Sequence, residues 1–339
     1  MKRLKYYVLT SSNLDLLKRH ASIEYSNIPI DLLVVVINTK DKAYEKEASE
    51  YCQQAGIEYY ITESNGTPGR GKNSLLEKFL ESDNDYCVQI DGDDYLTPHG
   101  VYVYNNLANT KNPPDAVCLT KQISMMYDPE GSSKIPMAMR FFHIDYDVEI
   151  AKLQEHGVDD RVIEFYQAQK KYSEKEESHC RVTWYSRNAA EHRFLENIHI
   201  GEDTLHYFKL KHEHFAGRLV FMNNVESPPT YIYDQTIDGI VKTNSQDPTN
   251  VYEWMGKYMQ ILRQYEKEGT LYDNSTHSLP LLKIDYPVEY VPDDYGYTGN
   301  MVYAVTDNLG NSGNMEHPAN ASEKSLIAKY QTMFQTDEK

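Results

Sequence analysis

An unbroken apolar run from Leu32 to Ile37 restricts the fold of this chain more than any other feature. Because every side chain in the run is apolar, a strand formed by it needs burial on both faces, as in a parallel sheet covered by helices. Further strands are predicted over 4–10, 57–62 and 85–90, and helices over 42–55 and 74–82. Strands that alternate with helices in this way predict a doubly wound α/β half-domain.

The rest of the chain is less regular. Helices are predicted over 148–176 with a break at Gly157, from Gly201 to about 211, over 249–267 and from about 322. Short strands are predicted over 116–122, 140–143, 181–186, 219–223 and 230–233. The first half therefore carries the regular sheet, and the later segments extend it.

Composition narrows the class of protein. A net charge of -17 excludes broad, non-specific binding to nucleic acid or to anionic membrane, because both need a basic surface. The four cysteines form no CxxC pair, which predicts free thiols in a reducing compartment rather than a zinc site. The N-terminus lacks a long apolar run, and no segment approaches the roughly 20 apolar residues that span a bilayer. We expect a cytoplasmic protein without a membrane span.

The strongest chemical signal is the acidic turn Asp91-Gly92-Asp93-Asp94, at the carboxyl end of a predicted buried strand. Ligands of open α/β sheets bind at that edge. Three carboxylates in four residues repel one another unless water or a cation neutralises them. Mn²⁺ or Mg²⁺ suits such oxygen ligands and would in turn hold a diphosphate. A solvated acidic turn is the simpler interpretation of this segment alone. An EF-hand loop is excluded, because Tyr95 and Leu96 replace the Asp or Asn and the Gly that it needs.

The second signal is a glycine-rich loop expected from Gly66 to Lys72. It comes close to the P-loop pattern GxxxxGK[ST], but Asn73 replaces the magnesium-binding hydroxyl. Two strand–helix units also precede it, whereas a P-loop normally follows the first strand. A P-loop NTPase is therefore disfavoured.

The order of these motifs resembles family 2 glycosyltransferases of GT-A fold, over roughly residues 5 to 245. In that family three segments follow one another: a strand with Asn and Asp, a loop N-x-G-x-x-x-(A)-R-N, and a strand that ends in D-x-D-D. An E-D pair begins a later helix. The matching segments here are Ile37-Asn38-Thr39-Lys40-Asp41, Asn65 to Asn73, Asp91 to Asp94, and Gly201-Glu202-Asp203-Thr204. The chain departs from the pattern with Gly66, and with Lys72 where Arg is usual; Lys still supplies a cation to a diphosphate, but no planar fork.

The resemblance implies an inverting, metal-dependent glycosyltransferase that moves a hexosyl or pentosyl group from a nucleoside-diphosphate sugar, expected to be a UDP-sugar, to a hydroxyl. Asp203, beside Glu202, is implied as the general base, although acids are common in first helical turns because the helix dipole favours them. The implied ligands for Mn²⁺ or Mg²⁺ are Asp91, Asp93 and Asp94. The implied donor-binding residues are Ser11, Asn38, Asp41, Asn65, Arg70, Lys72, Asn73, Asp91 and Gly92.

The same resemblance implies an α/β fold of GT-A type, with a Rossmann-like, mostly parallel sheet and helices on both faces. It assigns residues 1–125 to a nucleotide-sugar-binding half and 126–245 to the acceptor-binding and catalytic half of one domain. Residues 246–339 would form a helical and irregular extension.

The distribution of charged residues along the chain bears on the kind of acceptor. Residues 161–218 hold six of the twelve histidines, with ten Lys and Arg against nine Asp and Glu, so nearly all the net negative charge lies elsewhere. An anionic acceptor, such as a hydroxylated base in phage DNA, suits this asymmetry; a saccharide, or an ordinary solvated surface, suits it as well. The residues expected at the acceptor are Arg181, Trp184, Arg187 and Lys211.

Two alternatives remain beside this interpretation. A nucleotidyltransferase of related sheet topology typically has a glycine-rich phosphate loop after the first strand, and Ser11-Ser12-Asn13 offers none. A non-catalytic nucleotide- or metal-binding module would keep the acidic turn without a base, and Asp203 argues against it.

Overall fold

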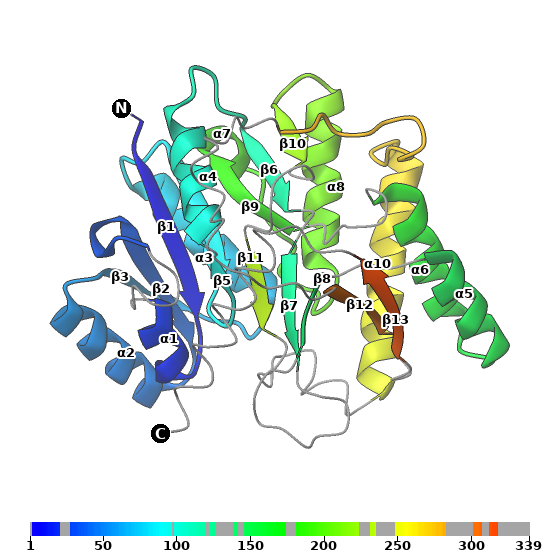
Figure 1. The fold of residues 1–339 in the computed structure, drawn as a ribbon, viewed down its shortest axis with the longest axis horizontal. Coiled ribbons are helices and arrows are strands. Elements are labelled where there is room, and N and C mark those ends of the chain that lie inside the picture. The colour runs from blue at the N-terminus through cyan, green and yellow to red at the C-terminus, as the bar shows by residue number, and fades with distance from the viewer. Residues whose placement is uncertain are drawn as a thin grey trace.

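The structure is a computed structural model, and it describes residues 2–20, 28–96, 98–119, 122–126, 138–141, 146–173, 181–223, 231–234, 248–282, 301–306 and 312–317. A twisted sheet with helices on both sides forms the body of the molecule, and a group of three helices lies at one side of it (Figure 1).

The main sheet has seven strands in the order β10-β6-β9-β4-β1-β2-β3. These are β1 Leu4–Thr10, β2 Leu33–Thr39, β3 Glu58–Glu63, β4 Tyr86–Asp91, β6 Ala116–Leu119, β9 Arg181–Ser186 and β10 Phe221–Asn223. All neighbouring pairs are parallel except those of β9, which runs antiparallel to both β4 and β6. Every residue of β2 is buried, as its apolar run predicts.

Each face of the main sheet has its own apolar core. On one face, α1 Leu14–His20, α2 Lys42–Ala55 and α4 Pro98–Asn109 pack against Tyr6, Val8 and Val35. On the other, α3 Pro68–Glu81, the short α7 Arg187–Ala190 and α8 Glu202–Phe215 pack against Tyr7 and Val34. The alternation along each strand thus sends successive side chains to opposite cores, which is why both faces need helices.

A second, four-stranded sheet stands beside the first in the order β5-β11-β7-β8. Its strands are β5 Tyr95–Leu96, β7 Gln122–Met126, β8 Ala138–Phe141 and β11 Tyr231–Asp234. Three helices, α5 Tyr146–Glu155, α6 Asp160–Tyr172 and α10 Pro248–Glu268, lie together at one side (Figure 1), and β12 Met301–Thr306 pairs with β13 Ser312–His317. The single-turn η1, Ile30–Leu32, precedes β2.

The predicted α/β class with a mostly parallel sheet is confirmed, and the helix predicted over 148–176 is indeed broken at Gly157. The prediction of a glycine-rich loop from Gly66 to Lys72 is wrong, because α3 already begins at Pro68 and includes Lys72. Thr67 caps this helix by accepting a hydrogen bond from the Arg70 N–H, and proline is well suited to a first helical turn. The helix predicted from about 322 lies outside the described residues.

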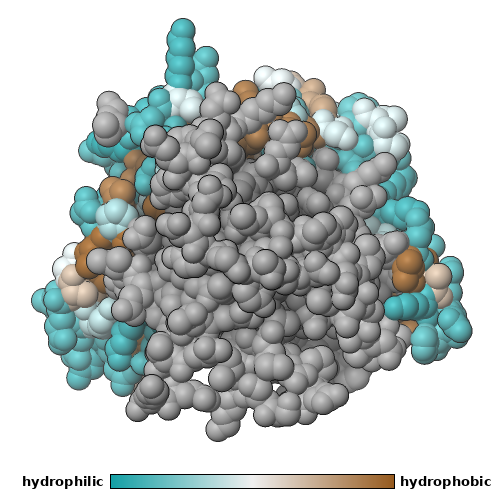
Figure 2. Space-filling model, in the orientation of Figure 1, coloured by the Kyte–Doolittle hydropathy of each residue, from teal (hydrophilic) through white to brown (hydrophobic). Residues whose placement is uncertain are grey.

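No described helix is both long enough and apolar enough to cross a bilayer. On the face shown in Figure 2, the coloured residues are mostly hydrophilic, and hydrophobic residues form smaller areas between them.

Candidate active site

The acidic turn follows β4 at the carboxyl edge of the main sheet. Asp91 is the last residue of the strand, and the Asp94 N–H closes the turn on the Asp91 carbonyl at 3.0 Å. Gly92 lies so close to β1 that a Cβ there would come within 2.5 Å of the Leu9 carbonyl oxygen, so only glycine fits. On its other side, the Gly92 carbonyl lies 3.1 Å from Nε2 of His20, at the end of α1. The turn is therefore held in place before any ligand binds.

Arg181 joins this turn to the start of α8. Because β9 runs antiparallel to β4, its first residue lies beside the last residue of β4. The Arg181 guanidinium is 3.3 Å from Asp91 Oδ2, contacts Asp94 directly, and reaches within 4.0 Å of Asp203 Oδ2. Tyr231 completes the arrangement: its hydroxyl donates to Asp94 Oδ2 at 2.9 Å and accepts from the Asp91 N–H at 3.2 Å.

Lys72 forms the second cationic centre of the site. Its Nζ lies 2.9 Å from Glu202 Oε1 and 2.5 Å from Asp203 Oδ1, and only 4% of its side chain is exposed. Burial by itself lowers the pKa of the Lys72 ammonium, but Asp203 and Glu202 outweigh it and hold the pKa above its ordinary value. The lysine therefore stays charged in the interior because two carboxylates surround it.

Carboxyl groups outnumber cations in this cluster. Four carboxylates, those of Asp91, Asp94, Glu202 and Asp203, share the two cations in the ion pairs given above. Burial raises the pKa of the Asp94 carboxyl well above its usual range, although Arg181 acts in the opposite direction. Burial raises the pKa of the Glu202 carboxyl as well, so a further cation at the exposed side would meet mainly Asp91 and Asp93.

The predicted metal ligands do not all face that side. Asp94 is fully buried against Arg181 and Tyr231, and its role as a metal ligand stays a prediction. Asp91 and Asp93 are partly exposed. Within the described ranges, no group of three or more His, Cys, Asp and Glu side chains is arranged to hold a metal ion. In the acidic turn, Asp91 and Asp93 are thus the acids with surface left for a metal, and Mg²⁺ is often held by one or two carboxylates beside substrate phosphates.

The start of α8, which carries Glu202 and Asp203, is fixed from behind. Gly201 has a left-handed conformation with φ of +75°, and a Cβ there would lie 2.5 Å from the ring of Tyr258 on α10. The Tyr258 hydroxyl in turn accepts a hydrogen bond of 2.8 Å from Gln169 on α6. Two helices that are distant in sequence thus set the position of the predicted base.

Two of the three predicted donor-binding residues near the first strands have structural roles. Asn38 is buried, and its amide donates to Thr62 and to the Glu63 carbonyl at 2.9 and 3.0 Å. Asp41 caps α2 by accepting from the Ala43 N–H at 2.8 Å. Ser11 is exposed immediately after β1, at the same edge as Asp91. Of these three, only Ser11 and Asp41 are accessible to a nucleotide.

The remaining donor-binding predictions cluster around α3. Asn73 is buried, and its amide donates to the Phe194 carbonyl at 3.0 Å and to Glu196 at 2.8 Å. Arg70 pairs with both Glu77 and Glu196 at 3.2 Å. Asn65 shapes the preceding turn by accepting from the Thr67 N–H at 2.9 Å. Asn73 is therefore a structural residue, whereas Arg70 and Asn65 keep part of their surface exposed.

The predicted acceptor residues are mostly not available to an acceptor. Trp184 is fully buried, with its indole N–H donating to the Pro114 carbonyl at 2.9 Å, and Lys211 is 1% exposed. Arg187 donates to the Leu80, Ser82 and Asn84 carbonyls around the end of α3. Trp184 and Lys211 are therefore buried away from solvent, and their part in acceptor binding stays an untested prediction. Arg181 belongs to the acidic cluster, where its guanidinium pairs with the buried Asp94 carboxylate.

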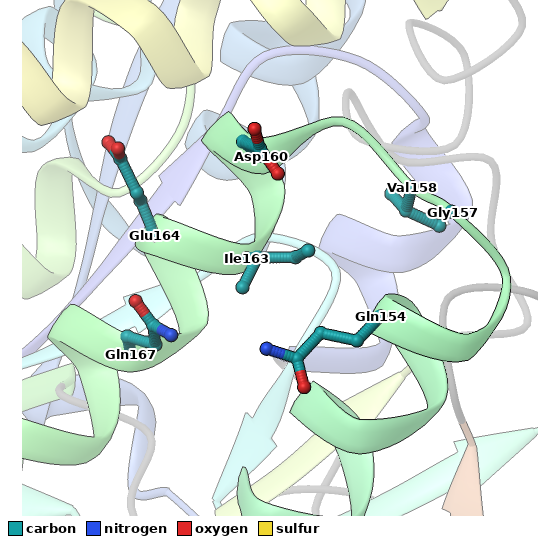
Figure 3. A pocket seen from close by; sticks show the side chains of 7 residues that line it. All are labelled: Gln154, Gly157, Val158, Asp160, Ile163, Glu164 and Gln167. Atoms are coloured by element: carbon teal, nitrogen blue, oxygen red, sulfur yellow. The ribbon is translucent and has the colours of Figure 1, made fainter.

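One cavity lies away from this cluster, between α5 and α6. Its volume is about 510 Å³, and Gln154 extends from α5 toward α6, which carries Asp160, Ile163 and Gln167 (Figure 3). None of the predicted site residues lines it. The polar cluster at the sheet edge, rather than this cavity, therefore remains the candidate site.

Comparison with known proteins gives similarity in structure alone. No family model matches the chain, and no curated protein matches it. Among solved structures, it is similar to Staphylococcus aureus TarS 1–349 in complex with UDP-GlcNAc, at 13% identity and TM-score 0.43, covering 72% of this chain and 61% of that one. It is also similar to a Pyrobaculum calidifontis mannosyltransferase in complex with GDP-Man and Mn²⁺, at 16% identity and TM-score 0.38, covering 69% and 57%. A third is a Bacillus anthracis protein described as a putative glucose-1-phosphate thymidylyltransferase, at 14% identity and TM-score 0.34, covering 67% and 88%.

Proposed function

We propose that the chain is a nucleotide-sugar-dependent glycosyltransferase of GT-A type with Asp203 as its general base. One observation carries the proposal: the acidic turn after β4 and the Glu202-Asp203 pair meet at the carboxyl edge of the sheet, linked by Arg181. The sequence resemblance expects these two motifs to work together, and ligands of open α/β sheets bind at that edge.

The exposure of the two acids at the start of α8 supports Asp203 rather than Glu202 as the base. The Asp203 side chain is 24% exposed, whereas that of Glu202 is 9% exposed. An acceptor hydroxyl can therefore approach Asp203 from solvent. In the proposed reaction the hydroxyl loses its proton to Asp203 as its oxygen attacks the anomeric carbon. The bond to the nucleoside diphosphate breaks in the same displacement, and the configuration at that carbon inverts.

A divalent cation fits the excess of carboxylate at this edge. Asp91 and Asp93 would hold Mn²⁺ or Mg²⁺, which would supply positive charge to the departing diphosphate. We expect Asp93→Asn to weaken Mn²⁺-dependent binding of UDP, and Asp91→Asn to do so to a lesser degree. Unchanged UDP affinity and turnover in both variants would exclude this metal assignment.

For the acceptor we propose a saccharide hydroxyl. Burial of Lys211 removes one of the cations that would attract an anionic acceptor. A hydroxylated base in DNA makes a distinct prediction, because turnover on a phosphate backbone falls by orders of magnitude between about 50 and 200 mM salt for about six contacts. Turnover that is flat over this range supports the saccharide.

The deciding experiment is a panel of UDP-, GDP-, TDP- and CMP-sugars with Mn²⁺, scored by nucleotide release and by thermal shift. We expect one nucleoside diphosphate to be released, and more rapidly when the acceptor is present. Release of pyrophosphate from a nucleoside triphosphate and a sugar phosphate would instead identify a nucleotidyltransferase. Binding without any release would identify a non-catalytic module.

A further inference from the structure

Lys72 stands where the sequence resemblance expects a cation for the donor diphosphate, yet its surroundings point to another task. The residue lies within α3 rather than in an exposed loop, and it is 3% exposed. Its Nζ faces the start of α8, where it contacts Asp203 Oδ1 at 2.5 Å and Glu202 Oε1 at 2.9 Å. A cation that binds a phosphate has to reach the ligand, and this one points into the protein.

The remaining sides of the ammonium are also occupied by protein. The ring of Phe194 lies beneath Nζ, with 5.5 Å between Nζ and the ring centroid. Phe194 is itself fixed to α3, because its N–H donates to Asn73 Oδ1 at 2.8 Å and its carbonyl accepts from the Asn73 amide at 3.0 Å. The Phe194 ring beside the ammonium is therefore fixed to α3 by Asn73, the residue next to Lys72 in sequence.

Asp203 lies between two different cations. Lys72 contacts Oδ1 from α3, and Arg181, the first residue of β9, lies 4.0 Å from Oδ2. Glu202 is buried and takes the second contact of Lys72, so the lysine fixes two successive side chains in the first turn of α8. Removing the ammonium would free the Asp203 carboxylate to rotate while the acidic turn stays in place through Arg181.

We propose that Lys72 is a positioning residue for Asp203 and does not bind the donor diphosphate. The inference rests on the proposed function, because it gives Lys72 a role in the step that Asp203 performs. It makes a prediction opposite to that of a phosphate-binding lysine: loss of Lys72 lowers kcat and leaves nucleotide affinity unchanged.

The test compares Lys72→Met and Lys72→Arg with Lys78→Met. Lys78 lies on the same helix, contacts Glu81 and Tyr60, and takes no part in the cluster. UDP affinity with Mn²⁺ is measured by calorimetry, and kcat and the donor KM with the sugar that the panel identifies. For Lys72→Met we expect UDP affinity within about twofold of wild type and kcat lower by about 100-fold, the cost typical of a misplaced catalytic group. Lys72→Arg restores most of kcat, and Lys78→Met behaves as wild type.

A double variant separates positioning from general damage. If Lys72 acts through Asp203, then Lys72→Met combined with Asp203→Asn is no slower than Asp203→Asn alone, because the base is already absent. If Lys72→Met folds poorly, the double variant Lys72→Met with Glu202→Gln replaces it, because this variant removes one buried carboxylate and keeps Asp203. Its UDP affinity then decides between the positioning role and the diphosphate role of Lys72.

The outcomes distinguish the two proposals. An active wild type in which Lys72→Met weakens UDP binding tenfold or more overturns the positioning role and restores the diphosphate role. Additive losses in the Lys72 and Asp203 double variant overturn it as well. A wild type that neither binds nor turns over any nucleotide sugar overturns the proposed function itself.

Discussion

At the scale of single residues, the site consists of charges placed where water cannot fully solvate them. Glu202, Lys72 and Arg181 are buried or nearly so, and Asp203 keeps contact with solvent, as Asp91 does. Ionised groups in an interior are retained when each has an opposite charge within reach, since isolated burial costs several kcal/mol per ion. The pairing explains how a reactive carboxylate can occupy a fixed position at the mouth of an otherwise closed cluster.

Replacing Asp203 with Asn tests the base directly. We expect transfer to fall by about 10² to 10⁴-fold, the usual contribution of a general base, with UDP affinity and fold retained. Asp160→Asn, a first-turn acid of α6, is the matched control and should lower stability by no more than about 1 kcal/mol through the helix dipole. An Asp203→Asn variant with a lower melting temperature and a normal rate would identify a capping residue instead.

His206, one helical turn after Asp203, gives a prediction for pH. Burial lowers the pKa of its imidazole well below the ordinary value, and Lys209, His192 and Lys72 act in the same direction. The folded state therefore favours neutral His206. Its contribution to stability is complete above the unfolded pKa of about 6.5 and is lost as the pH falls below it, by up to about 1.4 kcal/mol per pH unit.

The measurement is urea unfolding between pH 7.5 and 5 for wild type and His206→Phe. Phenylalanine keeps the stacking on Phe194, whose ring centroid lies 3.8 Å from that of His206. We expect the wild type to lose more unfolding free energy than the variant over this range, because only the wild type carries the neutral imidazole. Parallel pH profiles would mean that His206 binds its proton equally well in both states.

At the scale of elements, the position of α8 depends on its first glycine. Gly201 and Gly217 flank this helix, and both have left-handed backbone, with φ of +75° and +73°. They differ in their surroundings: a Cβ at Gly201 would meet the Tyr258 ring at 2.5 Å, whereas one at Gly217 would meet nothing within 4 Å. The pair therefore separates backbone strain from packing.

Alanine at the two positions should have different effects. Gly217→Ala is expected to cost about 1 kcal/mol of unfolding free energy, from the left-handed conformation alone. Gly201→Ala adds the displacement of a buried ring, about 1–3 kcal/mol more, and shifts the start of α8, so kcat falls as well. Equal costs in urea unfolding, with normal kcat in both, would show that Tyr258 does not set the helix position.

At the scale of the whole molecule, the strands of the site come from both halves of the chain. β9 inserts between β4 and β6, so Arg181 comes to lie beside the end of β4. The second sheet contributes Tyr231, whose hydroxyl contacts the same turn. The acidic turn is thus completed by segments that follow it by 87 residues or more along the chain.

Arg181→Met should therefore destabilise the fold strongly. It leaves the fully buried Asp94 without this ion pair, and breaking such a buried pair costs about 3–5 kcal/mol. Adding Asp94→Asn removes the opposing charge and should recover much of that loss. Arg218→Met, which breaks the exposed pair with Glu213, is the control and should cost less than about 1 kcal/mol in the same urea experiment. No recovery in the double variant would show that Arg181 stabilises the fold by packing alone.

The sequence by itself determined the elements. The apolar run of β2, the alternation of strands and helices, and the position of the acidic turn after a strand are local patterns, and hydrophobic periodicity encodes them directly. Even the start of α3 had a local signal, because Thr67 and Pro68 form a cap and first turn that the glycines obscured. The motif order likewise indicated Asp91 and Asp203 as partners in one site.

Only the tertiary structure decided which charge meets which. The pairing of Lys72 with Asp203, the placement of Arg181 between the turn and α8, and the burial of Trp184 and Lys211 depend on strand order and helix packing. An ammonium has the same local sequence signature whether it faces a phosphate or a carboxylate. The difference lies in contacts between residues more than 100 positions apart, which local periodicity does not encode.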